Sequence, residues 1–183
     1  MSGLVLWGII LIRVLGVGLF ISLDPLIAYL INGMLDAVDG PIYKHLIKLP
    51  PVKAQLIDKA LDLWLYCWAY LLLPSLPSFA MHFLTATFLL RLVGQFCFFA
   101  TKNRRVLLYF PNFFEVTFLY VLFLERLGSN LTDNLIPLIG LYLGKIAHEY
   151  ILHHKEITIF DHVLIPGLHL FQKKRRTYRA SKR

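Results

Sequence analysis

Long apolar runs, interrupted by short polar segments, dominate the chain. Proline, glycine or charged residues bound each run, and the runs are long enough for helices rather than strands. They cover residues 4–23, 25–38, 53–73, 79–100, 106–124 and 134–152. A helix that crosses a membrane needs about 20 apolar residues. The pattern therefore predicts an all-α polytopic membrane protein, with a six-transmembrane-helix bundle formed by residues 1–152.

Proline and glycine mark the predicted ends of the first helices. Asp24-Pro25 is expected to end the first span and to cap the second helix. Gly40-Pro41 is expected to stop the second helix. Residues 153–183 are less apolar and end in a basic run, which predicts an interfacial segment followed by a cytoplasmic tail.

Composition agrees with a membrane domain. Of the 183 residues, 57% are hydrophobic, and this share exceeds that of ordinary soluble domains. The six predicted spans leave no room for a substantial soluble domain. The net charge is +8, and most of the excess lies in predicted loops and the tail. There it is expected to orient the protein and meet anionic membrane lipids rather than nucleic acid.

Basic residues are unevenly divided between the two predicted sides of the membrane. The loops on one side contain Lys44, Lys48, Lys53, Lys59, Lys102, Arg104 and Arg105. The turns on the other side contain Arg126 as their only base. Cytoplasmic loops of membrane proteins carry the excess of lysine and arginine. The basic side is therefore predicted to face the cytoplasm.

Four of the eleven carboxylate side chains lie within residues 36–62. Asp36 and Asp39 are three residues apart and Asp58 and Asp62 four apart, so each pair shares one face of a helix. If the two helices are antiparallel neighbours, the four carboxylates converge and repel one another unless cations lie between them. Mg²⁺ and Mn²⁺ prefer such all-oxygen ligands. The spacing predicts a metal site on the cytoplasmic side.

These residues resemble the motif of the CDP-alcohol phosphotransferases, D-x-x-D-G-x-x-A-R followed by G-x-x-x-D-x-x-x-D. The matching positions are Asp36, Asp39, Gly40, Asp58 and Asp62. Two parts depart from the motif, because Tyr43-Lys44 replaces the Ala-Arg pair and Ala54 replaces the second glycine. The match covers residues 36–62, and the six-helix layout extends the resemblance.

The resemblance implies a transferase of phospholipid biosynthesis. Members of the family transfer a substituted phosphate group from a CDP-alcohol to an acceptor alcohol and release CMP. Short length favours CDP-diacylglycerol as donor. The resemblance implies Mg²⁺ or Mn²⁺ bound by Asp36, Asp39, Asp58 and Asp62, with Asp62 also the general base. It places Gly40, Lys44 and Ala54 at the substrate. Members are often dimeric, so a homodimer is possible.

Charged residues inside other predicted spans have two readings. Arg91 and Lys145 either bind a substrate phosphate or pair with Glu115 or Glu149. For Arg13, simple pairing of this kind, or extension of the side chain to the interface, is the preferred expectation.

Two rival functions stay open. The altered Tyr43-Lys44 and Ala54 positions allow a catalytically degenerate relative that binds lipid or a partner protein. Histidines near the end of the chain suggest instead a membrane metalloenzyme with a histidine box. They are His148, His153, His154, His162 and His169. Such enzymes use two or three boxes, and this chain offers one.

Overall fold

The computed structural model describes residues 2–71 and 76–154, and every regular element in those two ranges is helical. The α-helices are α1 (Ser2–Gly16), α2 (Leu19–Ser22), α3 (Pro25–Pro41), α4 (Pro51–Leu71), α5 (Ser78–Thr101), α6 (Val106–Tyr109), α7 (Phe113–Arg126) and α8 (Leu135–His154). A π-helix, η1 (Ile42–Ile47), follows α3, and a short 3-10 helix, η2 (Thr132–Asn134), precedes α8. The predicted all-α class is confirmed for the described residues.

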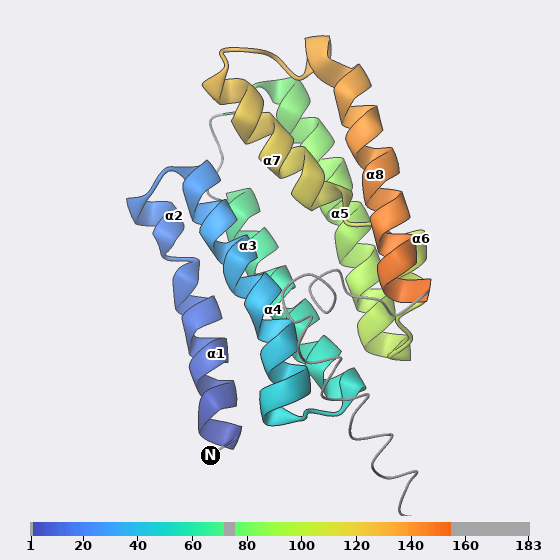
Figure 1. Ribbon diagram of the computed structural model, residues 1–183. Helices are drawn as coiled ribbons and strands as arrows, with labels where there is room; N and C mark the ends of the chain where they lie inside the picture. The colour runs from blue at the N-terminus through green and yellow to red at the C-terminus, as the bar shows by residue number, and fades with distance from the viewer. Residues whose placement is uncertain (1, 72–75, 155–183) are drawn as a thin grey trace, which may run out of the picture.

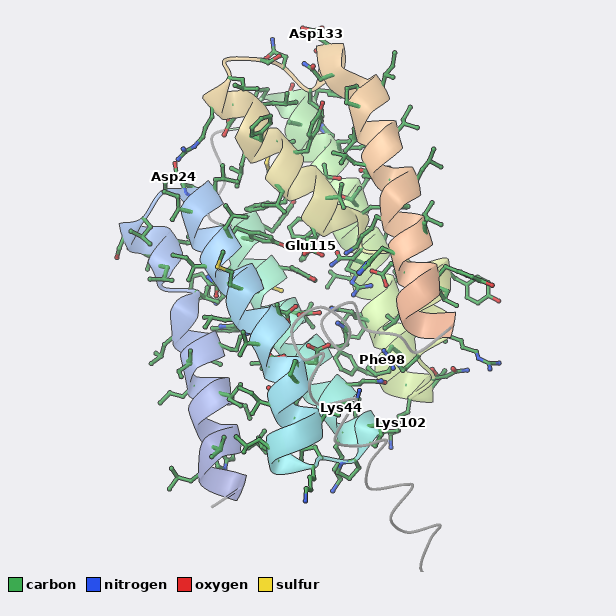
Figure 2. The ribbon with its side chains drawn as sticks, viewed as in Figure 1. Asp24, Lys44, Phe98, Lys102, Glu115 and Asp133 are labelled. Carbon is green, nitrogen blue, oxygen red and sulfur yellow. The ribbon has the colours of Figure 1, made fainter. Side chains whose placement is uncertain are left out.

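The longer helices run up and down between two ends of the molecule (Figure 1). Helices α1, α3 and α4 form one group and α5, α7 and α8 another, joined where α4 packs on α5 and α3 on α7. The turn after α3 and the turn after α5 lie at the same end, which we call the basic end; it carries Lys44 and Lys102 (Figure 2). Asp24 and Asp133 lie at the opposite end.

Among the residues that the structure describes, two helical segments, Gly3–Ser22 and Ser78–Thr101, are long and apolar enough to cross a membrane. Large apolar side chains on these segments and on α8 point outward. Examples are Leu4, Trp7, Leu89, Phe96, Ile136 and Leu143. Exposed apolar surface of this extent is typical of membrane or interaction surfaces.

Three of the predicted apolar runs depart from simple helices. The first run breaks at Val17-Gly18, between α1 and α2. The second was expected to stop at Gly40-Pro41, and this is wrong, because α3 includes Pro41 and continues directly into η1. Proline lacks an N–H and its ring crowds the preceding turn, so the helix widens here into a π-helix instead of ending. It ends at Lys48, whose φ is 57°.

The fifth run is divided as well, into α6 and α7. Proline at position 111 cannot donate a backbone hydrogen bond, so the chain leaves the helix around it. Asn112 then caps α7, since its side chain accepts a hydrogen bond from the N–H of Glu115. The break frees the carbonyl of Phe110, which accepts a hydrogen bond from Arg91 of α5.

The core of the described residues lies where α3, α4, α5 and α7 meet. Aromatic and small side chains fill it, and Phe114, Phe118, Ala28 and Ala69 are completely buried. The small residues allow close approach of helices, while the rings pack edge-on and tilted against one another. This packing fixes α3 beside α4, and the predicted acidic pairs lie on these two helices.

Candidate metal centre

Antiparallel packing of α3 and α4 brings the acidic pairs together. Asp36 and Asp39 lie in the last turns of α3, while Asp58 and Asp62 lie in the first turns of α4. Carboxylate oxygens of Asp36, Asp58 and Asp62 all lie within 4.8 Å of one another. Asp39 is not in that group of three, but it shares the guanidinium of Arg13 with Asp36. The four residues therefore form one acidic centre near the basic end.

Arg13 of α1 lies inside this centre. Its Nη1 is 2.6 Å from Asp36 Oδ1 and 3.1 Å from Asp39 Oδ2, and its Nη2 is 3.4 Å from Asp62 Oδ1. The expectation that Arg13 pairs with Glu115 or Glu149, or reaches the interface, is therefore wrong. A buried guanidinium needs carboxylates beside it, and the carboxylates within reach of α1 are those of the acidic centre.

A signal for this contact is present in the sequence. Arg13 stands eleven residues before Asp24, and Asp36 stands twelve residues after it. If the chain reverses at Asp24, two antiparallel helices place positions 13 and 36 at the same depth. The symmetry about the turn could have identified Arg13 as the partner of the acidic pair.

Lys59 is a second cation in the centre. Its Nζ lies 2.7 Å from Asp58 Oδ2 and 2.7 Å from Asp62 Oδ2. From sequence it counted only as one of the basic loop residues. Lys59 lies well inside α4, next to Asp58 and three residues before Asp62, so the helix itself brings its Nζ to both carboxylates.

The centre combines buried and partly exposed carboxylates. Arg13, Asp39 and Asp62 are each less than 5% exposed, whereas the side chains of Asp36 and Asp58 are 40% and 25% exposed. Asp39 Oδ1 is buried and has no hydrogen-bond partner among the described residues. Four carboxylates surround two cations, so two negative charges remain when all are ionised. An unpartnered buried carboxylate oxygen and an all-oxygen ligand set fit a hard divalent cation.

Two hydrogen bonds from neighbouring helices fix the end of α1. Asn32 Nδ2 donates to the carbonyl oxygens of Gly16, at 3.0 Å, and of Ala28, at 2.9 Å. Trp64 Nε1 of α4 donates to the carbonyl oxygen of Val14, at 3.3 Å. Because α1 ends at Gly16, its last carbonyl groups lack partners within the helix and are free to accept these bonds. Arg13 is thereby positioned from both α3 and α4.

The predicted substrate-contacting residues lie around the same end. Gly40 is exposed, and no atom lies within 4 Å of the position that a Cβ would take, so packing does not require glycine there. Lys44 is exposed on η1, and Ala54 is half-buried on α4, one turn before Asp58. Tyr43, which replaces the motif's alanine, is buried and only 1% exposed.

Arg91 and Lys145 belong to a second polar group, between α5, α7 and α8. Lys145 Nζ lies 3.0 Å from Glu115 Oε2 and 3.7 Å from Glu149 Oε1, as in the pairing alternative. Arg91 is 2% exposed, and its Nη1 donates to the carbonyl of Phe110 at 3.2 Å. Its Nε has no hydrogen-bond partner among the described residues. Glu115 lies near the middle of the molecule (Figure 2).

The histidine-box hypothesis falls largely outside the described residues. His148 is half-buried on α8. The side chains of His153 and His154 are not among the described ones, and His162 and His169 lie beyond residue 154.

Comparison with models of known families, with curated proteins and with solved structures finds no match to this chain. Inference about function therefore rests on the chemistry of the acidic centre and on its motif.

Proposed function

We propose that the protein is a membrane-embedded phosphotransferase of the CDP-alcohol type, acting in phospholipid biosynthesis. The observation that carries the proposal is the convergence of Asp36, Asp58 and Asp62, within 4.8 Å, from two helices that bear the motif spacing. The buried, unpartnered oxygen of Asp39 supports it, because such an oxygen favours a cation beside it.

Asp36, Asp39, Asp58 and Asp62 would hold Mg²⁺ or Mn²⁺, which would neutralise the charge of the substrate's diphosphate. In the reaction, the hydroxyl oxygen of the acceptor attacks the phosphorus that carries the donor alcohol. The bond from that phosphorus to the bridging oxygen breaks, and CMP leaves with the bond's electron pair. Asp62 takes the proton of the hydroxyl. To do so it exchanges one of its hydrogen bonds, from Lys59 or Arg13, for one from the acceptor.

The partly exposed part of the centre suits a charged, water-soluble head group. Asp36 and Asp58 are its more exposed carboxylates, and Gly40, one turn after Asp36, has open space around it in which a phosphate or nucleotide could approach. Lys44 would attract phosphate as a point charge. Ala54 would adjoin the nucleotide. Arg91, whose Nε lacks a partner among the described residues, would bind a phosphate of the acceptor or lipid, and Lys145 would do so after leaving Glu115.

We propose six spans, with the basic end in the cytoplasm. The up-and-down course of the helices and their outward apolar side chains support this placement (Figure 1). Lysine and arginine gather at the end of the bundle near the acidic centre. CDP-linked substrates are cytosolic, so this orientation gives them access to the centre.

A second candidate function is a lipid- or partner-binding membrane protein without catalysis. The observation in its favour is that Arg13 and Lys59 already pair with all four aspartates. Such a network joins α1, α3 and α4 and could serve structure alone. The buried Tyr43, where the motif has alanine, also favours this candidate.

Transfer of a radiolabelled group separates the two candidates. The purified protein in lipid vesicles is incubated with CDP-diacylglycerol or a CDP-amino alcohol, a set of small acceptor alcohols, and Mg²⁺ or Mn²⁺. We expect labelled phospholipid and CMP, both abolished by a metal chelator and by Asp36→Asn. No product from any donor, with a folded protein, would favour the non-catalytic candidate.

A further inference from the structure

The acidic centre contains its own cations. Lys59 Nζ lies between Asp58 and Asp62, 2.7 Å from an oxygen of each, which is where a small ion would bridge them. The guanidinium of Arg13 connects Asp36, Asp39 and Asp62. Every carboxylate of the centre therefore touches a fixed positive charge supplied by the chain.

We propose that Arg13 and Lys59 are built-in counter-cations, so that the centre takes up one divalent cation per chain and not two. Arg13 and Lys59 hold the carboxylates in place and supply the charge that a second ion would otherwise bring. They act as positioning residues, and the single ion is bound by the remaining oxygens.

The net charge of the centre supports one divalent cation per chain. Four ionised carboxylates and two cations leave two negative charges, which one divalent ion neutralises. A second ion would leave two positive charges in a largely buried site before any substrate arrives. Uncompensated charge in such a site is strongly unfavourable.

Geometry supports the same conclusion. Asp39 Oδ1 is buried without a partner among the described residues, so one strong acceptor remains after Arg13 has bound. Both oxygens of Asp62, in contrast, already accept hydrogen bonds, from Arg13 and from Lys59. Arg13 cannot easily withdraw, because hydrogen bonds from Asn32 and Trp64 fix the end of α1.

The experiment counts metal ions on the purified full-length protein without substrate. Mn²⁺ is titrated and followed by the loss of the free-ion electron paramagnetic resonance signal. We expect one ion per chain in the wild type. Lys59→Gln and Arg13→Gln should each tighten binding by about tenfold or more, because each removes a positive charge within a few ångströms of the ion. The double variant should bind two ions.

The matched control is Lys53→Gln, an exposed lysine of the same helix, which should leave affinity and number unchanged. Arg13→Lys keeps the charge and should still give one ion; if Arg13→Gln does not fold, Lys59→Gln carries the test. Two ions or none on the wild type would overturn the proposal. So would a Lys59→Gln variant that binds more weakly than, or no differently from, the control.

This inference rests on the proposed function in sharing its metal ion, yet the two fail in different ways. One ion per chain without transfer from any CDP-alcohol would contradict the proposed function and leave the counter-cations in place. A wild type that carries out transfer but binds two ions before substrate would support the proposed function and contradict the counter-cation proposal.

Discussion

Asp62 is the carboxylate of the centre that contacts both cations. Its two oxygens accept hydrogen bonds from Lys59, at 2.7 Å, and from Arg13, at 3.4 Å. It is 4% exposed and lies well inside α4, so its charge is stabilised by these two cations rather than by water. In the proposed reaction, Asp62 could accept a proton only after one of these two hydrogen bonds is released, because both cations favour its ionised form.

The first prediction concerns this residue. Asp62→Asn keeps the shape of the side chain but removes the base, so transfer should fall about 10² to 10⁴-fold. Mn²⁺ binding should survive better than in Asp36→Asn or Asp39→Asn, which remove metal ligands. Transfer and Mn²⁺ titration are measured on the same samples. Asp133→Asn, exposed at the opposite end, is the control and should change neither. Equal transfer by Asp62→Asn and wild type would contradict the base role.

The second prediction restores two residues of the motif. Ala54→Gly removes a methyl group, and Lys44→Arg supplies a planar fork that can bind phosphate with two hydrogen bonds. The paired change should maintain transfer or raise it, chiefly by lowering KM for the CDP-alcohol. Steady-state kinetics with varied donor concentration provide the measurement. A loss of transfer, with an unchanged melting temperature, would contradict the prediction that the motif residues favour nucleotide binding at these positions.

Among the elements, α1 has the most specific position. Its break after Gly16 releases the carbonyl groups that Asn32 and Trp64 bind, and this places Arg13 between α3 and α4. A Cβ on Gly16 would lie 2.9 Å from Asn32 Oδ1, closer than side-chain atoms normally approach. A methyl group at this position would therefore displace the Asn32 side chain or move α1 away from α3.

The third prediction tests that contact. Gly16→Ala should lower the free energy of unfolding by about 1–3 kcal/mol, because the methyl group forces α1 away from Asn32. Gly33→Ala on α3 is the matched control, because no atom lies within 4 Å of its Cβ position. Thermal unfolding in detergent is measured for both variants, Gly16→Ala and Gly33→Ala. Equal melting temperatures would argue against close packing at Gly16.

Across the whole molecule, charge is divided between two ends. Lysine and arginine gather where α3 ends and α4 begins and around the start of α6. At the other end, Arg126 Nη2 is 2.6 Å from Asp24 Oδ1, so the base is paired there. The basic end is therefore the one expected to face the cytoplasm.

The fourth prediction is a test of this orientation. In a background where Cys67 and Cys97 are serine, single cysteines replace two exposed residues: Arg105, three residues after Lys102 of the basic end, and Asp133 at the opposite end. An impermeant thiol reagent applied to intact cells should label the cysteine at position 133 and not that at 105. Lysis should expose both. Labelling of both positions in intact cells, or of 105 alone, would contradict the proposed topology.

The sequence by itself determined the helical class and the residues of the acidic centre. Local features sufficed for both, because apolar runs of helical length are read along the chain, and spacings of three and four place carboxylates on one face. The continuation of α3 through Pro41 was missed, because proline usually ends a helix and only the wider π-helical turn accommodates it here.

Only the tertiary structure decided that Arg13 enters the centre. Arg13 lies 49 residues from Asp62 along the chain, and α1 reaches it because Gly16 permits close packing on Asn32. Lys59, in contrast, could have been assigned from sequence, because it lies within the predicted helix 53–73, next to Asp58 and three residues before Asp62. A pattern along one helix shows which face a carboxylate shares, but not which side chain of another helix faces it; that depends on how the helices pack.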